Sequence, residues 1–244
     1  MVLLYILGGV TALAAAYVLF LFICSLFVDP SREYDRVSPF YRRLLDDATA
    51  IAMKLLRIKV HVTGTENVPR GQPLLFVGNH RSNFDPIVTW YAFRPWQIAF
   101  VSKPENFKIP IFGRFIRKCA FMAIDRQDPR KAIATINQAA ALLEQGEACV
   151  GVYPEGTRSK SGQLLPFHNG VFKIAKKAGA GIVVLAVSGT EEIHKRVPFR
   201  KSHVYLDVRA VIPAEEVKRE RTEVIGQRVR SLLTPEEIRE KEAV

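Results

Sequence analysis

The chain has 244 residues, 48% of them hydrophobic, with a formal net charge of +11 and an isoelectric point near 9.7. This length suffices for one substantial core, so we expect one domain and an anchor. The charge favours an anionic partner, and a membrane surface is preferred over nucleic acid because no zinc-ligand spacing, RNA-binding aromatic signature or basic arm accompanies it. The odd number of cysteines, all in apolar surroundings, indicates a reduced compartment: Cys24, Cys119 and Cys149.

Residues 1–28 predict a membrane anchor helix. From Val2 to Val28 no side chain is charged, and at about 1.5 Å per residue the segment is long enough to cross a hydrocarbon layer of roughly 30 Å. A cleaved signal peptide is disfavoured, because no Lys or Arg precedes the apolar run and no small-x-small pattern follows it. We expect the anchor to span the membrane or dip into it. Basic residues after it predict a domain on the cytoplasmic side of the cell membrane: Arg32, Arg36, Arg42 and Arg43.

The region 29–58 predicts a second, amphipathic helix. Ser38 is a suitable cap, and Pro39 suits the first turn. Apolar residues then recur at helical spacing: Phe40, Leu44, Leu45, Ala48, Ile51, Ala52, Leu55 and Leu56. This apolar face packs either on the core or on the membrane surface, and the pattern alone favours neither.

From residue 59 to 213 strand-like and helix-like segments alternate. One helix is well delimited, with Asp128 as cap, Pro129 in the first turn and Gly146 as stop. The alternation predicts an α/β domain with a mostly parallel central sheet flanked by helices. Residues 214–244 predict a charged helical tail. The expected strands are Lys59–Thr63, Leu74–Val77, Gln97–Val101, Ala120–Ile124, Ala148–Tyr153, Ile182–Val187 and His203–Val211.

The loop after the second expected strand carries a candidate proton acceptor. It runs from Gly78 to Pro86 and contains His80 and Asp85, which are separated by four residues. The spacing suits a loop histidine that faces a carboxylate in the first turn of the next helix. In such a pair the neutral imidazole removes a proton, while the carboxylate holds its tautomer and stabilises the imidazolium.

Two further strand ends add polar residues to the same predicted edge of the sheet. One delivers Arg126, whose planar fork matches two phosphate oxygens. The other opens the loop 153–159, where Arg158 offers a second fork, Gly156 allows close backbone approach and the Thr157 hydroxyl adds a donor. No acidic residue occurs between positions 156 and 190, so this edge favours an anionic group.

The stretch 103–118 mixes five cations with six large apolar side chains and contains one acid, Glu105. This mixture suits the boundary between lipid tails and phosphate headgroups. A solvated basic face over a small hydrophobic cluster is the alternative.

Three blocks in this order, 79–85, 121–126 and 153–159, resemble the glycerolipid acyltransferase family, most closely the 1-acylglycerol-3-phosphate acyltransferases that make phosphatidic acid. The similarity runs from about Gly64 to about Val187, most of the expected α/β domain. One departure is Val184, where the family usually has proline. The resemblance implies a catalytic pair, His80 and Asp85, and an acceptor-binding set: Lys103, Arg126, Glu155, Gly156, Thr157 and Arg158.

The resemblance implies transfer of an acyl group from a thioester of coenzyme A or acyl carrier protein to the 2-hydroxyl of 1-acylglycerol-3-phosphate, a membrane lipid. It implies no metal, no other cofactor and no nucleic acid partner. No acyl-enzyme is expected, because the sequence has no Gly-x-Ser-x-Gly elbow. The alternatives are another lysolipid or glycerol 3-phosphate as acceptor, a metal-dependent phosphohydrolase using His80, Asp85 and Glu155, and a non-enzymatic module that binds anionic lipid.

Overall fold

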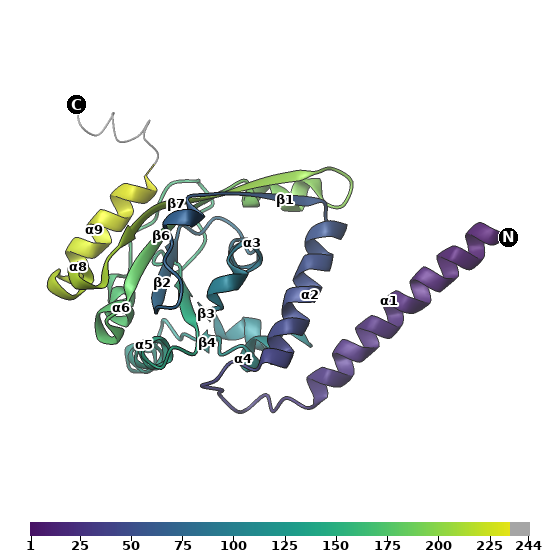
Figure 1. The fold of residues 1–244 in the computed structure, drawn as a ribbon, viewed down its shortest axis with the longest axis horizontal. Helices are drawn as coiled ribbons and strands as arrows, with labels where there is room; N and C mark the ends of the chain where they lie inside the picture. The colour runs from purple at the N-terminus through teal and green to yellow at the C-terminus, as the bar shows by residue number, and fades with distance from the viewer. Residues whose placement is uncertain (235–244) are drawn as a thin grey trace.

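The structure is a computed structural model that describes residues 1–234. A seven-stranded sheet with helices on both faces forms the domain, and one long helix projects from it (Figure 1). The strand order is β1-β7-β6-β2-β5-β3-β4, and every neighbouring pair is parallel except β6 and β7. The predicted α/β class is therefore confirmed. The strands are β1 (Ile58–Thr63), β2 (Leu74–Gly78), β3 (Ile98–Ser102), β4 (Met122–Ala123), β5 (Cys149–Val152), β6 (Gly181–Ser188) and β7 (Ser202–Ile212).

All seven predicted strands are present, and the largest difference is at β4. Five residues, Ala120–Ile124, are predicted, but only Met122 and Ala123 pair with β3. Ala120 has a positive φ of 57°, a left-handed conformation that cannot continue an extended strand. The chain therefore enters β4 late, at the edge of the sheet.

The parallel part of the sheet brings the chemistry-bearing loops together. Strands β2, β5 and β3 are consecutive and parallel, and β4 continues the row. Their carboxyl ends therefore lie at one edge, where ligands of open α/β sheets bind. The loops after β2 and β5 are immediate neighbours because these two strands pair directly, with Val77 opposite Val152.

Helices cover both faces because strand side chains alternate between them. Along β2, Phe76 packs with Phe93 on one side, whereas Leu75 packs with Leu143 on the other. The helices of eight residues or more that flank the sheet are α2 (Pro39–Leu55), α3 (Asp85–Ala92), α5 (Pro129–Glu144) and α9 (Thr222–Leu233); the shorter ones are α4 (Phe112–Lys118), α6 (Lys173–Ala178), α7 (Ile193–Arg196) and α8 (Ala214–Arg219). Asp128 caps α5 as predicted, accepting hydrogen bonds from two backbone N–H groups.

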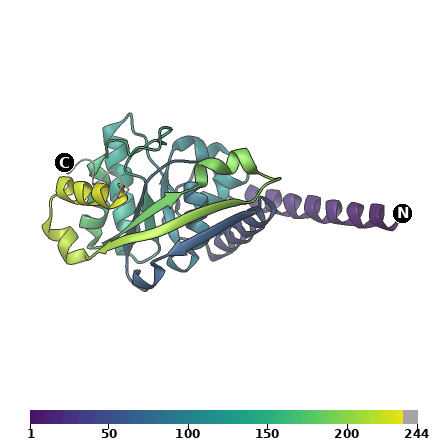
Figure 2. The ribbon, with the colours of Figure 1, turned by 90° about the horizontal axis from the view of Figure 1, so that it is seen from above.

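Helix α1 (Val2–Leu26) corresponds to the predicted anchor. It extends away from the domain in both ribbon views (Figures 1 and 2). Its segment Leu4–Leu26 has a mean hydropathy of 2.4 and is exposed along most of its length; near its end Cys24 and Ser25 are buried against the domain. A 23-residue apolar helix is long enough to cross a bilayer, so α1 indicates association with a membrane.

Helix α2 has apolar residues on two faces. Tyr41, Leu45 and Met53 are buried, as expected for a helix that packs on the core. Ile51 and Leu55 remain exposed, as expected for a helix that contacts a membrane surface. One face of α2 therefore fits the first expectation, and the other face fits the second.

Arg42 packs between two helices. It is only 7% exposed, and its guanidinium lies over the Trp90 ring at 3.9 Å. Burial lowers its pKa, while Asp46 acts in the opposite direction. Arg42 therefore contributes to packing between α2 and α3.

Three of the five cations in the basic stretch 103–118 contact other parts of the protein. Arg114 donates to the Ser25 carbonyl at 2.9 Å, Arg117 lies over the Phe107 ring and Lys118 lies over the Tyr34 ring. These three cations thus hold the linker between α1 and α2 or cover apolar side chains. Lys103 and Lys108 remain exposed.

The predicted tail is integrated with the domain as far as the structure describes it. Val217 of α8 and Ile225, Val229 and Leu233 of α9 are buried in the same cluster as β6. The last ten predicted tail residues, 235–244, lie outside the described residues.

Strand β6 runs without a break through Val184, with a register shift against β7 immediately after it.

Candidate active site

Asn79 holds the first site loop to the sheet. Its side-chain amide donates to the Val187 carbonyl at 2.9 Å and accepts from the Val187 N–H at 2.7 Å. Asn79 thus continues the pairing of β2 with β6 by one residue, using its side chain in place of a strand backbone. His80 is consequently the first residue beyond the sheet, and it follows a residue that two hydrogen bonds fix to β6.

His80 and Asp85 form the predicted pair. Nδ1 of His80 lies 2.8 Å from Oδ2 of Asp85, which is fully buried at the start of α3. The same carboxylate accepts the backbone N–H groups of Arg81 and Ser82 at 2.6 and 2.7 Å and the Thr190 hydroxyl at 2.5 Å. Since every other neighbour of the carboxylate is a donor, the carboxylate accepts a hydrogen bond from the Nδ1–H of the ring, and Nε2 of the neutral ring keeps a free lone pair.

The Tyr153 ring stacks on one face of the His80 imidazole. The rings of His80 and Tyr153 stack with their centroids 4.5 Å apart and their planes at 21°. Burial, and secondarily the negative charge of Asp85, raises the pKa of Tyr153 well above its ordinary value. The phenol therefore stays neutral and acts as a flat apolar surface that limits rotation of the His80 ring.

Glu155 joins the two site loops. Its carboxylate accepts the backbone N–H of His80 at 2.6 Å and that of Leu165 at 2.9 Å, and the Ser159 N–H donates to the His80 carbonyl at 2.8 Å. Glu155 is 3% exposed and does not line the cavity described below. The resemblance implied acceptor binding for this residue, whereas its placement favours positioning of the His80 backbone.

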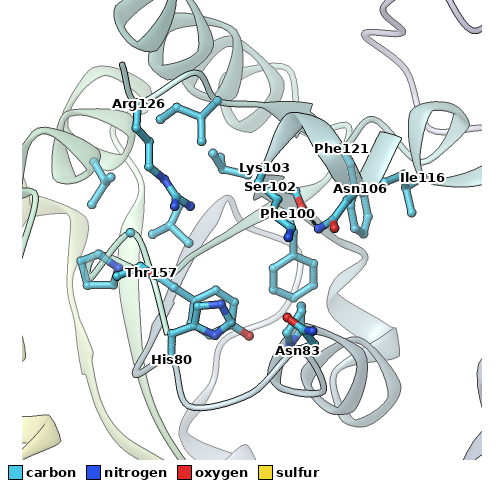
Figure 3. Close-up of a pocket in the computed structure, with 18 of the residues that line it drawn as sticks. His80, Asn83, Phe100, Ser102, Lys103, Asn106, Ile116, Phe121, Arg126 and Thr157 are labelled. Atoms are coloured by element: carbon cyan, nitrogen blue, oxygen red, sulfur yellow. Dashed lines mark hydrogen bonds between the residues drawn. The ribbon is translucent and has the colours of Figure 1, made fainter. Parts of the chain in front are cut away.

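A cavity of about 730 Å³ opens beside His80 (Figure 3). In Figure 3 the Arg126 side chain extends into the cavity on the side where His80 lies. Partial burial lowers the pKa of Arg126, with Glu105 acting in the opposite direction, yet the guanidinium stays cationic because arginine is not deprotonated in proteins. The structure thus brings together all the predicted site residues except the two buried carboxylates as cavity lining: His80, Lys103, Arg126, Gly156, Thr157 and Arg158.

His168 is a lining residue that the sequence analysis missed. Its ring lies so close to Gly156 that a Cβ at that position would be 2.9 Å from the imidazole and 3.7 Å from Arg126. The His168 N–H donates to the Pro154 carbonyl at 2.8 Å, which holds this segment against the second site loop. In the sequence, the only sign of a site role for His168 is that it lies nine positions after Ser159, the last residue of the second site loop.

One wall of the cavity is apolar. Helices α2, α3 and α4 supply it together with the segments that flank β3 and β4. Sequence reasoning did not select these residues, because an apolar side chain lining a cavity looks the same in sequence as one filling a core. They are Leu45, Ile87, Trp90, Phe100, Ile116 and Phe121.

The donor set does not suit a metal ion. Both oxygens of Asp85 and both oxygens of Glu155 already accept hydrogen bonds from the protein. Within residues 1–234 no group of three or more His, Cys, Asp or Glu side chains is arranged to hold a metal. Asp85 and Glu155, the carboxylates that a phosphohydrolase would use as ligands, accept hydrogen bonds that fix the site loops.

The fold and the site together define an α/β protein with a hydrogen-bonded histidine-aspartate pair at the carboxyl edge of its sheet. The chain belongs to the Acyltransferase family, whose model matches residues 59–188, more than half of its length.

Relatives with assigned names agree with this membership. The chain is 32% identical over 204 residues to a 1-acyl-sn-glycerol-3-phosphate acyltransferase of Chlamydomonas reinhardtii, covering 80% of this chain and 60% of that protein. It is 30% identical over 183 residues to the alpha 1-acyl-sn-glycerol-3-phosphate acyltransferase of Bos taurus, covering 74% and 63%. The chain thus spans somewhat under two thirds of the length of these relatives.

A solved structure has the same fold. The crystal structure of the 1-acyl-sn-glycerophosphate acyltransferase PlsC from Thermotoga maritima superposes with a TM-score of 0.63 at 23% sequence identity, covering 79% of this chain and 76% of that one. The mostly parallel sheet with flanking helices is therefore shared.

Proposed function

We propose that the protein transfers an acyl group from an acyl thioester to the 2-hydroxyl of 1-acylglycerol-3-phosphate and so forms phosphatidic acid. One observation carries the proposal: the hydrogen-bonded pair of His80 and Asp85 lies at a cavity that is lined both by cations and by large apolar side chains. A phosphorylated, single-tailed lipid has the matching anionic and apolar parts. The names of the relatives in the Acyltransferase family support this acceptor class.

The pair supplies the chemistry. Nε2 of His80 takes the proton of the 2-hydroxyl while that oxygen attacks the thioester carbonyl, and Asp85 stabilises the resulting imidazolium. The tetrahedral intermediate then expels the thiolate, which takes the proton from His80. No covalent intermediate with the protein is needed, since neither a cysteine nor a nucleophile elbow lines the cavity.

Three cations hold the acceptor. Arg126, Lys103 and Arg158 line the cavity and can meet the phosphate from different sides. Fixing the phosphate positions the hydroxyl beside His80, and such positioning lowers the barrier as effectively as the proton transfer itself. Gly156 and Thr157 also line the cavity, where close backbone approach and a hydroxyl donor are useful.

The acyl thioester, of coenzyme A or of acyl carrier protein, is the only further reactant in this scheme. Its acyl chain fits the apolar wall near Trp90 and Phe121. Helix α1 keeps the domain at the cell membrane, where the lysolipid acceptor resides, and we place the domain on the cytoplasmic side, where the thioester is made. The scheme needs neither a metal nor a further cofactor.

The experiment is an acyl-transfer assay with purified protein, labelled acyl thioester and a panel of acceptors: 1-acylglycerol-3-phosphate, 1-acylglycerophosphocholine and glycerol 3-phosphate. We expect transfer mainly to the first, and a chelator should leave the rate unchanged. His80→Ala should lower kcat roughly 10²- to 10⁴-fold. His61→Ala, an exposed histidine on β1 that does not line the cavity, is the matched control. A His80→Ala protein that transfers at the wild-type rate would refute the proposal.

A further inference from the structure

A basic loop with an exposed aromatic residue lies far from the cavity. It comprises residues 194–201, from α7 to the start of β7, and we call it the basic tip. Four of its eight residues are Lys or Arg and none is acidic. Phe199, at its centre, is 85% exposed. Neither the family resemblance nor the proposed reaction uses this segment.

The basic tip is a folded turn with defined hydrogen bonds. Arg57, just before β1, donates through its guanidinium to the Phe199 carbonyl at 2.9 Å, and the Ser202 N–H donates to the Arg57 carbonyl at 3.2 Å. Within the turn the Arg200 N–H donates to the Arg196 carbonyl at 2.8 Å. These bonds hold the backbone with the Phe199 ring outside the protein, so its exposure is built into the turn.

The cations around Phe199 are mostly available. Lys195 pairs with Glu192 at 2.8 Å, whereas Arg196, Arg200 and Lys201 are exposed and form no ion pair with any residue in the range 1–234. Aromatic rings between cations are typical of surfaces that lie at the headgroup level of a bilayer, where the ring enters the acyl boundary and the charges meet phosphates.

The end of α2 enlarges this surface. Leu55 is 70% exposed and Lys54 is also exposed, and both come directly before the Arg57 that bonds to the basic tip. Apolar and basic side chains of two separate segments are therefore combined at one end of the molecule.

The basic tip and α1 lie on the same side of the domain. α1 joins the domain near the beginning of α2, whereas the basic tip lies near the end of α2 (Figure 1), and α8 and α9 lie on the opposite side in both ribbon views (Figures 1 and 2). A bilayer that contains α1 is therefore on the side of the domain that carries the basic tip. An acidic soluble protein would match the charges, but it would leave Phe199 and Leu55 without an apolar partner.

We infer that the basic tip is a second membrane contact, which binds anionic phospholipid headgroups through its cations and inserts Phe199 at their level. Together with α1 it gives the domain two points of attachment and so sets its orientation on the membrane. The inference does not depend on the reaction, because it concerns the location of a loop that does not line the cavity.

Tryptophan fluorescence tests it. Phe199→Trp in the full-length chain is reconstituted into vesicles of phosphatidylcholine and phosphatidylglycerol with brominated acyl chains. Val224→Trp, an exposed apolar position on α9 at the opposite end, is the matched control, and the wild-type protein gives the background of the buried Trp90 and Trp96. We expect a blue shift and bromine quenching for Phe199→Trp and neither for Val224→Trp.

Charge is tested in the same reporter. Adding Arg196→Gln and Arg200→Gln to Phe199→Trp should reduce the quenching on anionic vesicles but change little on pure phosphatidylcholine, and high salt should act likewise. Equal quenching at positions 199 and 224, or none at 199, would overturn the inference. So would a Phe199→Trp signal that responds to an acidic carrier protein and not to vesicles. Acyl transfer by the same variants in detergent micelles separates these outcomes from a failure of the proposed reaction.

Discussion

The backbone N–H of His80 donates a hydrogen bond of 2.6 Å to the Glu155 carboxylate, across 75 residues of sequence. The second oxygen of Glu155 accepts from Leu165, so one buried side chain joins the loop of the base to the loop that lines the cavity. The position of the His80 imidazole thus depends on a residue that does not face the substrate space.

Glu155→Gln should lower kcat without a matching change in the acceptor KM. The amide can accept one of the two N–H groups, but its NH₂ faces the other, and leaving a buried donor unpaired costs about 1–3 kcal/mol of folding free energy. The resulting shift of His80 should reduce kcat by up to about 10²-fold. Steady-state kinetics and urea unfolding measure the two effects. A raised acceptor KM at unchanged kcat would show instead that Glu155 binds the acceptor.

Gly156 has a steric reason to be glycine that Gly162 lacks. Both have positive φ, 69° and 79°, but a Cβ at 156 would meet the His168 ring at 2.9 Å, whereas one at 162 would meet nothing within 4 Å. Alanine at either site costs about 1–2 kcal/mol of backbone strain. Only Gly156→Ala should also displace the His168 ring from its place in the cavity lining and raise the acceptor KM. Equal KM values for the two variants would mean that the contact with His168 has no part in binding.

Arg126→Ala should affect the phosphorylated acceptor and spare the thioester donor. Loss of charge-assisted hydrogen bonds worth about 1.5–3 kcal/mol corresponds to a rise in acceptor KM of roughly 10- to 150-fold. Arg130→Ala, on the exposed side of α5 and outside the cavity lining, is the control. Parallel increases in both KM values would indicate that Arg126 only supports the fold.

The buried thiols Cys119 and Cys149 should resist alkylation in the folded protein. Burial raises the pKa of Cys119 to about 12 and that of Cys149 to about 11. Because the raised pKa moves thiolate formation to higher pH, almost no reactive thiolate exists at pH 8, and access is blocked as well. Mass spectrometry after iodoacetamide treatment should find both unmodified until denaturant is added. Rapid labelling of either one under native conditions would contradict their burial.

The local pattern was sufficient for the strands and for the pair of His80 and Asp85. Buried parallel strands are continuous apolar runs, and a loop with Asp before Pro opens the next helix at a definite residue. His80 and Asp85 lie within six residues of chain, so their proximity followed from the local sequence, although distant residues hold both side chains in place. For the same reason α1 could be recognised from its uninterrupted apolar composition.

Only the tertiary structure decided the roles that depend on distant partners. It showed that Glu155 accepts a hydrogen bond from the His80 backbone and that Arg42 lies over Trp90, and it added His168 and apolar residues to the cavity lining. The sequence does not show whether a charged side chain contacts a ligand, an aromatic ring or a backbone amide. Its burial and its contacts depend on which elements pack together. The sequence by itself determined which residues could carry chemistry, and the packing of the sheet decided which of them face the cavity.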